Sequence, residues 1–174
     1  MTRIAIIAGS TRPNRRSRIV ADWVHASAQG RGDAEYEVVD LVDVDLPLLD
    51  EPVPAAFGQY QRPHTKAWSK RIALFDGFVF VTPEYNQSIP AALKNAIDYL
   101  YNEWHGKPAG IVGYGIDGGK FAVEHLRQIC AEVKLAGVPT AVMLKVFDDF
   151  TDDGVRADRH RADLLQMLDE MAGR

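Results

Sequence analysis

Apolar residues along the chain follow two alternating spacings. Short continuous apolar runs, rich in β-branched residues, predict buried strands, whereas apolar residues three or four positions apart predict amphipathic helices. The predicted strands cover residues 4–8, 36–41, 77–82, 111–114 and 138–144. The predicted helices cover residues 19–28, 66–75, 91–101, 121–136 and 164–171, and Gly137 is expected to end the fourth. Residues 42–63 contain four prolines and predict a long irregular surface connection, a kind of segment that often acts as a lid.

This alternation of strands and helices predicts an α/β fold in one domain over residues 1–174. Strands joined by helical crossovers lie parallel, with helices on both faces of the sheet. Ligands of such sheets bind beyond the carboxyl ends of the strands, where the strand order reverses. With the order 2-1-3-4-5, the loops after the first, third and fourth strands converge there. These three loops carry most of the candidate chemistry of the chain.

Composition narrows the class of protein. The chain has 47% hydrophobic and 25% charged residues, which is typical of a globular protein. Its formal net charge of -4 argues against a nucleic-acid partner. No apolar run approaches the ~18 residues of a membrane span, no signal-peptide pattern opens the chain, and a single cysteine is present. We therefore expect a cytoplasmic protein with no membrane partner. Cys130 shares a helical stripe with Val123, Leu126 and Val133, which predicts a core position, and a redox role is the alternative.

The loop after the first predicted strand is a candidate phosphate site. It leads from Gly9 into a helix, and the first N–H groups of a helix attract anions because they lack partners within the helix and lie at the positive end of its dipole. Hydroxyl and guanidinium groups add further donors. The alternative is a solvated basic loop with a serine or threonine helix cap. The donor side chains of the loop are Ser10, Thr11, Arg12, Arg15, Arg16 and Ser17.

Two motifs together resemble those of a known family. The first is Gly9-Ser10-Thr11-Arg12 with Arg15 and Ser17 close behind it, and the second is the run PEYNQSIPAALKNAID at residues 83–98. With these motifs the chain resembles the flavodoxin-like NAD(P)H-dependent FMN reductase and quinone or azo reductase family, from residue 4 to about residue 139. The resemblance implies a flavodoxin-like three-layer sandwich around a five-stranded parallel sheet.

The resemblance also implies a cofactor and a reaction. FMN would bind without a covalent bond, with its phosphate in the loop 10–17, its ring on residues 83–86 and its pyrimidine end at Gly115. Arg15 matches the family arginine better than Arg16, which interrupts the register, and both stay candidates for the phosphate. Hydride would pass from NADPH or NADH through FMN to a small-molecule acceptor such as a quinone, an azo compound, free flavin or a metal ion. The expected cofactor-binding residues are Ser10, Arg12, Arg15, Arg16, Ser17, Pro83, Glu84, Tyr85, Asn86 and Gly115.

The residue types suit that role. Pro83 and Tyr85 can supply a flat surface for a flat ring, and the backbone after Tyr85 can bind its polar edge. No side-chain acid or base is required, so no catalytic residue is assigned. An FMN-binding electron carrier or redox sensor without turnover is the alternative function. The arginines of the first loop and the modest net charge favour the enzyme.

Three further patterns are better explained by structural roles than by nucleotide, metal or catalytic sites. Residues 113–118 match the dinucleotide fingerprint G-x-G-x-x-G, but no acidic residue ends the next strand, which favours a tight turn. The five histidines lack metal-ligand spacing, so no metal site is expected. Glu84 has no Ser, Cys or His partner in its motif. We expect it to hold its loop through backbone or arginine contacts.

An aromatic cluster predicts self-association. Tyr99, Leu100, Tyr101 and Trp104 follow the third predicted helix, and an exposed patch of this kind usually marks an interface. The alternative is packing beneath the acidic C-terminal segment. We expect a homodimer or homotetramer in which a neighbour's aromatic side chain helps to cover the flavin, and the resemblance implies the same.

Overall fold

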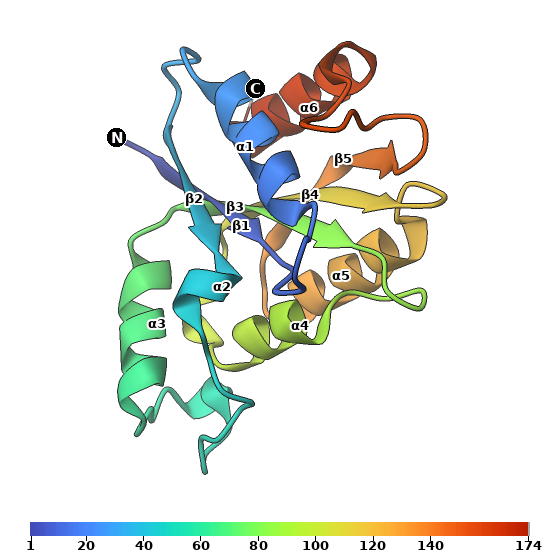
Figure 1. Cartoon of the computed structure of the whole chain (residues 1–174). Helices are drawn as coiled ribbons and strands as arrows, with labels where there is room; N and C mark the ends of the chain where they lie inside the picture. The colour runs from blue at the N-terminus through green and yellow to red at the C-terminus, as the bar shows by residue number, and fades with distance from the viewer. Residues whose placement is uncertain (174) are drawn as a thin grey trace.

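A five-stranded parallel sheet forms the centre of the molecule in a computed structural model, which describes residues 1–173 (Figure 1). The strands lie in the order β2-β1-β3-β4-β5, and every neighbouring pair is parallel. This arrangement confirms the predicted strand order and the flavodoxin-like α/β fold. The strands are β1 (Arg3–Ala8), β2 (Glu35–Asp40), β3 (Gly77–Pro83), β4 (Pro108–Gly115) and β5 (Ala136–Lys145).

Helices cover both faces of the sheet (Figure 1). α1 (Ser17–Ala28) and α6 (Ala157–Met171) lie on one face, and α3 (Pro63–Ala73), α4 (Ala91–Asp98) and α5 (Lys120–Glu132) lie on the other. Each face buries its own apolar cluster. β3 is buried at every position because it is central and covered from both sides, as its continuous apolar run predicts. Over residues 1–173, no helix has the length and apolar content that crossing a bilayer requires.

The segment between β2 and α3 is more regular than predicted. It begins with the short helix α2 (Leu41–Val44) and contains one turn of 3-10 helix (Ala55–Phe57). The carboxylate of Asp40 accepts the N–H of Val42 at 3.2 Å and caps α2. The prediction of irregular structure over residues 42–63 is therefore wrong for these two turns. A local side-chain cap forms the first of them, and apolar periodicity does not reveal such a cap.

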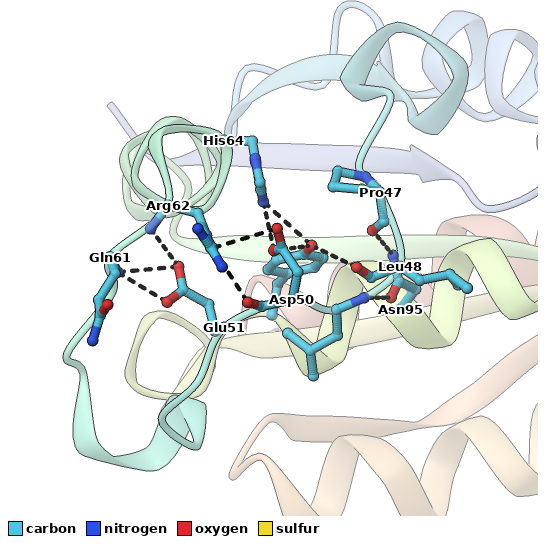
Figure 2. A network of polar contacts seen from close by, with 10 residues as sticks. Pro47, Leu48, Asp50, Glu51, Gln61, Arg62, His64 and Asn95 are labelled. Carbon is cyan, nitrogen blue, oxygen red and sulfur yellow. Dashed lines mark hydrogen bonds and ion pairs between the residues drawn. The ribbon is translucent and has the colours of Figure 1, made fainter.

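Polar contacts fasten the same segment to α3 and α4 (Figure 2). The Leu49 N–H donates to the side-chain oxygen of Asn95 at 2.9 Å, and the Asn95 amide donates to the Pro47 carbonyl at 2.8 Å. Further along, His64 lies 2.8 Å from the carboxylate of Asp50. The segment predicted as a lid is thus held against α3 and α4 through residues 47–50 in this structure.

The C-terminal end of α5 also differs from the prediction. The helix ends at Glu132, before Gly137, which lies inside β5. Lys134 adopts a left-handed conformation with a φ of 61°. The N–H groups of Lys134 and Leu135 then close the helix with hydrogen bonds of 3.1 and 2.9 Å to carbonyls of its last turn. This is the Schellman motif, in which glycine usually occupies the position that a lysine takes here. The expected role of Gly137 as the helix terminator is therefore wrong.

The aromatic cluster after α4 is mostly core and not an exposed patch. Tyr99, Leu100 and Trp104 are at most 1% exposed. The ring of Trp104 lies 4.8 Å from that of Phe78 and 6.2 Å from that of Phe80, between centroids. The cluster belongs to the α3, α4 and α5 face, so it does not pack beneath the C-terminal helix either. Because the segment after α4 packs into the core, the prediction of an exposed interface patch is wrong.

Candidate active site

Three loops meet at the carboxyl edge of the sheet. The Gly9 N–H donates to the Val81 carbonyl at 2.9 Å, which joins the loop after β1 to the end of β3. The hydroxyls of Ser10 and Tyr85 are 2.8 Å apart, so the two sequence motifs touch directly. The Glu84 N–H donates to the Tyr114 carbonyl at 2.9 Å and joins the third loop to the second. The predicted convergence of these loops is confirmed.

The first loop turns its small polar side chains inward. Gly9 is required there, because a Cβ atom would lie 2.7 Å from the Val81 carbonyl oxygen. Ser10 is fully buried, and its hydroxyl accepts the Arg12 N–H at 3.3 Å. The hydroxyl of Ser17 donates to the Ser10 carbonyl at 3.4 Å. No side chain caps α1 and no acidic residue lies in its first turn, so its N–H groups stay open to an anion.

The three arginines of the first loop have different partners. Arg15 forms an ion pair of 2.5 Å with Asp40, whose side chain is 3% exposed. The guanidinium of Arg12 lies 5.8 Å from the ring centroid of Tyr85, and that of Arg16 lies 4.7 Å from the ring centroid of Phe150. Within the described chain, neither Arg12 nor Arg16 has a carboxylate partner within 4.0 Å. These two cations are the ones available to an anionic ligand.

A cavity of about 300 Å³ opens between the loops. It combines two guanidinium groups with apolar and aromatic walls, a combination that suits a flat ring carrying an anionic group. A Cβ atom on Gly115 would lie 3.1 Å from the Gly119 nitrogen and 3.2 Å from the Cβ of Glu84, so a larger residue would crowd the second and third loops where they meet. The lining residues are Arg12, Arg16, Pro83, Glu84, Tyr85, Tyr114, Gly115, Ile116, Val146 and Phe147.

The predicted site residues divide into three groups. Six of them line the cavity: Arg12, Arg16, Pro83, Glu84, Tyr85 and Gly115. Three others are engaged within the protein: Ser10 and Ser17 are buried in the first loop, and Arg15 is paired with Asp40. Asn86 lies exposed in the turn of the second loop. Sequence reasoning missed Tyr114, Ile116, Val146 and Phe147. Tyr114 and Ile116 stand next to a predicted site glycine, whereas no polar motif marks the residues after β5.

The second loop is a tight hairpin turn. Tyr85 and Ser88 exchange backbone hydrogen bonds of 2.9 and 3.1 Å. The two residues between them, Asn86 and Gln87, have φ values of 50° and 64°. Left-handed conformations of this kind cost about 1–2 kcal/mol per non-glycine residue. Such strain clusters at binding sites, where the surrounding structure maintains it.

The carboxylate of Glu84 caps a helix. Its Oε2 accepts the N–H groups of Phe121 and Ala122, at 2.9 and 3.3 Å, in the first turn of α5. This confirms that Glu84 holds its loop through backbone contacts. In the third loop, Gly118 and Gly119 have φ values of 77° and 75°, and the Gly118 N–H donates to the Gly115 carbonyl at 3.3 Å. The glycines of the fingerprint therefore form a tight turn, as the sequence favoured.

Comparison with known proteins places the chain in a family. Residues 2–149 match the family described as NADPH-dependent FMN reductase. The chain belongs to this family. It is 39% identical to an NAD(P)H-dependent FMN reductase of Schizosaccharomyces pombe, over 98% of this chain and 88% of that protein. It is 32% identical to a quinone reductase of Pseudomonas putida, over 97% and 92% of the two chains.

A solved structure shares the fold. The flavoenzyme NAD(P)H:(acceptor) oxidoreductase FerB of Paracoccus denitrificans matches with a TM-score of 0.78 and 24% identity, over 99% of this chain and 96% of that one. At 24% identity, this similarity is evidence for a shared fold alone. It agrees with the strand order and the helical layers described above.

The remaining reactive side chains lie apart from the cavity. Cys130 is 2% exposed in the core, as predicted, and burial raises the pKa of its thiol to about 12. A thiol in that state is a poor nucleophile. In the described part of the chain, no group of three or more His, Cys, Asp or Glu side chains is arranged to hold a metal ion.

Proposed function

We propose that this member of the family is an NAD(P)H-dependent oxidoreductase that uses bound FMN and reduces quinones. The observation that carries the proposal is the cavity at the carboxyl edge of the sheet, where Arg12, Arg16 and the uncapped N-terminus of α1 meet the Pro83 and Tyr85 loop. Azo compounds, free flavin and metal ions are further candidate acceptors, because an open cavity selects little by shape.

The residues of this chain fit FMN. Arg12, Arg16 and the first N–H groups of α1 would hold the phosphate, with Ser10 and Ser17 fixing the loop behind it. Pro83 and Tyr85 would support the ring. We assign the phosphate to Arg16 in preference to Arg15, since Asp40 already neutralises Arg15.

Bound FMN would supply the capacity to accept a hydride from a reduced nicotinamide and to deliver it to an acceptor. The chain's own part is to bind and orient. Backbone N–H groups of the second and third loops can stabilise negative charge at the ring's polar edge. Glu84, the one carboxylate of the cavity wall, is engaged at the start of α5. No acid or base is assigned, and protons can come from water.

Anaerobic reduction tests the proposal. The purified protein reconstituted with FMN should lose its yellow colour promptly on addition of NADPH or NADH, and a quinone should restore the colour. Prompt bleaching without reoxidation by any acceptor, or no bleaching at all, would favour the electron carrier or redox sensor instead.

A homodimer or homotetramer stays a prediction of the family resemblance. The buried aromatic cluster no longer supports it. Leu48, Leu49 and Phe57 are among the exposed large apolar residues and replace it as a candidate contact surface. Light scattering of the purified protein decides between these states and a monomer.

A further inference from the structure

A buried hydroxyl without a partner lies beside the first loop. Tyr114 stands near the end of β4, in register with Pro83 of β3, and is 5% exposed. Its phenol oxygen is buried, and no residue among 1–173 offers it a hydrogen bond. Buried polar side-chain atoms in folded proteins nearly always have a partner. A partner supplied by a ligand would explain this exception.

The position of this hydroxyl is fixed by its surroundings. The ring of Tyr114 packs edge to face against that of Phe150, with 5.8 Å between centroids. The backbone carbonyl of Tyr114 accepts the Glu84 N–H at 2.9 Å. Because both the ring and the backbone are held, the phenol is preorganised and does not need to be ordered when a ligand binds.

The polar neighbours of the phenol are Tyr85 of the second loop and three groups of the candidate phosphate loop. Ser17, Arg12 and Arg15 are the polar and positively charged groups that act on it from that loop. Ser17 lies close to the phenol, but no hydrogen bond joins the two hydroxyls. The Ser17 hydroxyl instead donates to the Ser10 carbonyl at 3.4 Å. Burial above all raises the pKa of the Tyr114 phenol, so it keeps its proton and can act as a donor throughout the physiological range. Tyr114 also lines the cavity that Arg12 and Arg16 line.

We propose that the Tyr114 hydroxyl donates a hydrogen bond to the phosphate of FMN, an inference that rests on the proposed function. The arginines and the N-terminus of α1 supply positive charge, and the phenol adds a directional donor that is already out of water. The phosphate is favoured over the ring as the acceptor because Ser17, Arg12 and Arg15 of the first loop surround the phenol together with Tyr85, and because Arg12 and Arg16 line the same cavity.

Flavin binding to Tyr114→Phe tests this inference without any turnover. Titrations that follow flavin fluorescence should show FMN affinity about ten- to hundredfold weaker than in the wild type, the range of a hydrogen bond to a charged group. Riboflavin lacks the phosphate, so its affinity should not change. Inorganic phosphate should raise the melting temperature of the flavin-free wild type, and Tyr114→Phe should show a smaller rise.

Stability supplies the control. Flavin-free Tyr114→Phe should be at least as stable as the wild type, because the substitution removes an unsatisfied buried hydroxyl. Tyr60→Phe is the matched variant: its hydroxyl donates to Glu103 at 2.8 Å, and Tyr60 does not line the cavity, so it should lose stability and bind FMN normally. Unchanged FMN affinity in Tyr114→Phe, an equal loss for both flavins, or an unstable variant would overturn the inference. A wild type that binds neither flavin would overturn the proposed function as well.

Discussion

Three neighbouring arginines illustrate how packing separates residues of one type. Arg15 lies against the nearly buried carboxylate of Asp40, which also caps α2, so its charge is used within the protein. Arg12 and Arg16 contact aromatic rings and line the cavity, and no ion pair neutralises them in the described chain. Their spacing along the sequence does not distinguish the three arginines, because the partner of Arg15, Asp40, lies at the end of β2.

Alanine substitutions of Arg15 and Arg16 should affect different properties: Arg16→Ala mainly FMN affinity, and Arg15→Ala mainly stability. Arg16→Ala should weaken FMN binding about ten- to hundredfold, since it removes a charge-assisted phosphate contact, with a loss of stability below about 1 kcal/mol. Arg15→Ala should lower stability by about 1–3 kcal/mol, because it leaves the buried Asp40 with only the more distant Arg18, at 3.9 Å, as an ionic partner, and it should affect FMN less. Fluorescence titration and urea unfolding of both variants measure the two effects. A larger FMN loss in Arg15→Ala would show that Arg15 is the phosphate ligand.

At the scale of elements, α5 is defined at both ends by contacts that periodicity does not show. Glu84, from another loop, caps its N-terminus, and this contact also fixes one wall of the cavity. Lys134 terminates the helix in a left-handed conformation. The exposed side chain of Lys134 contributes no hydrogen bond among the described residues that would offset the strain.

Replacing Lys134 by glycine should stabilise the protein. Glycine adopts a positive φ without steric strain, although it has more conformational freedom to lose in the unfolded chain, so the net gain should be about 0.5–1 kcal/mol. Urea unfolding followed by circular dichroism measures the gain. Lys134→Ala is the matched control, because it removes the charge and keeps the Cβ atom, and it should change stability little. Equal effects of the two substitutions would show that the charge, not the conformation, is decisive.

At the scale of the whole molecule, Asp149 joins the end of the sheet to the last helix. Its carboxylate accepts the Lys145 N–H at 2.7 Å and lies 3.2 Å from Arg159 and 3.0 Å from His160 of α6. The segment it anchors carries Val146 and Phe147, which form one side of the cavity. Burial by itself would raise the pKa of Asp149, but these hydrogen bonds outweigh it and lower the pKa below its usual value.

This lowered pKa predicts an acid dependence of stability. Because the unfolded chain binds the proton more readily, the contribution of Asp149 is fully present above its unfolded pKa of about 3.9 and is lost as the pH falls through the lower folded pKa. Asp149→Asn should therefore be less stable than the wild type at pH 7, by about 1–3 kcal/mol, and the difference should shrink below about pH 4. Urea midpoints at pH 7, 4 and 3 measure this. Exposed Asp152→Asn is the control, and a constant difference at all pH values would contradict the prediction.

The sequence by itself determined the order of the strands and helices and the two motifs that meet at the site. Apolar periodicity and loop chemistry are local properties, and they sufficed for the parallel sheet, for the convergence of three loops and for the arginines of the first loop. The cavity-lining residues Pro83, Glu84, Tyr85 and Gly115 followed from the family resemblance. The family resemblance rests on the same local motifs, and the match over residues 2–149 confirms it.

Only the tertiary structure decided which side chains are free and which are occupied. Arg15 forms an ion pair with Asp40, Glu84 accepts hydrogen bonds from the start of α5, and Trp104 packs against Phe78 in the core. Each of these partners lies far from its residue in sequence. The unpartnered hydroxyl of Tyr114 and the cavity wall at Val146 and Phe147 became visible in the same way. Hydrogen bonds, ion pairs and burial depend on groups brought together by the whole fold, whereas hydrophobic spacing depends on the chain alone.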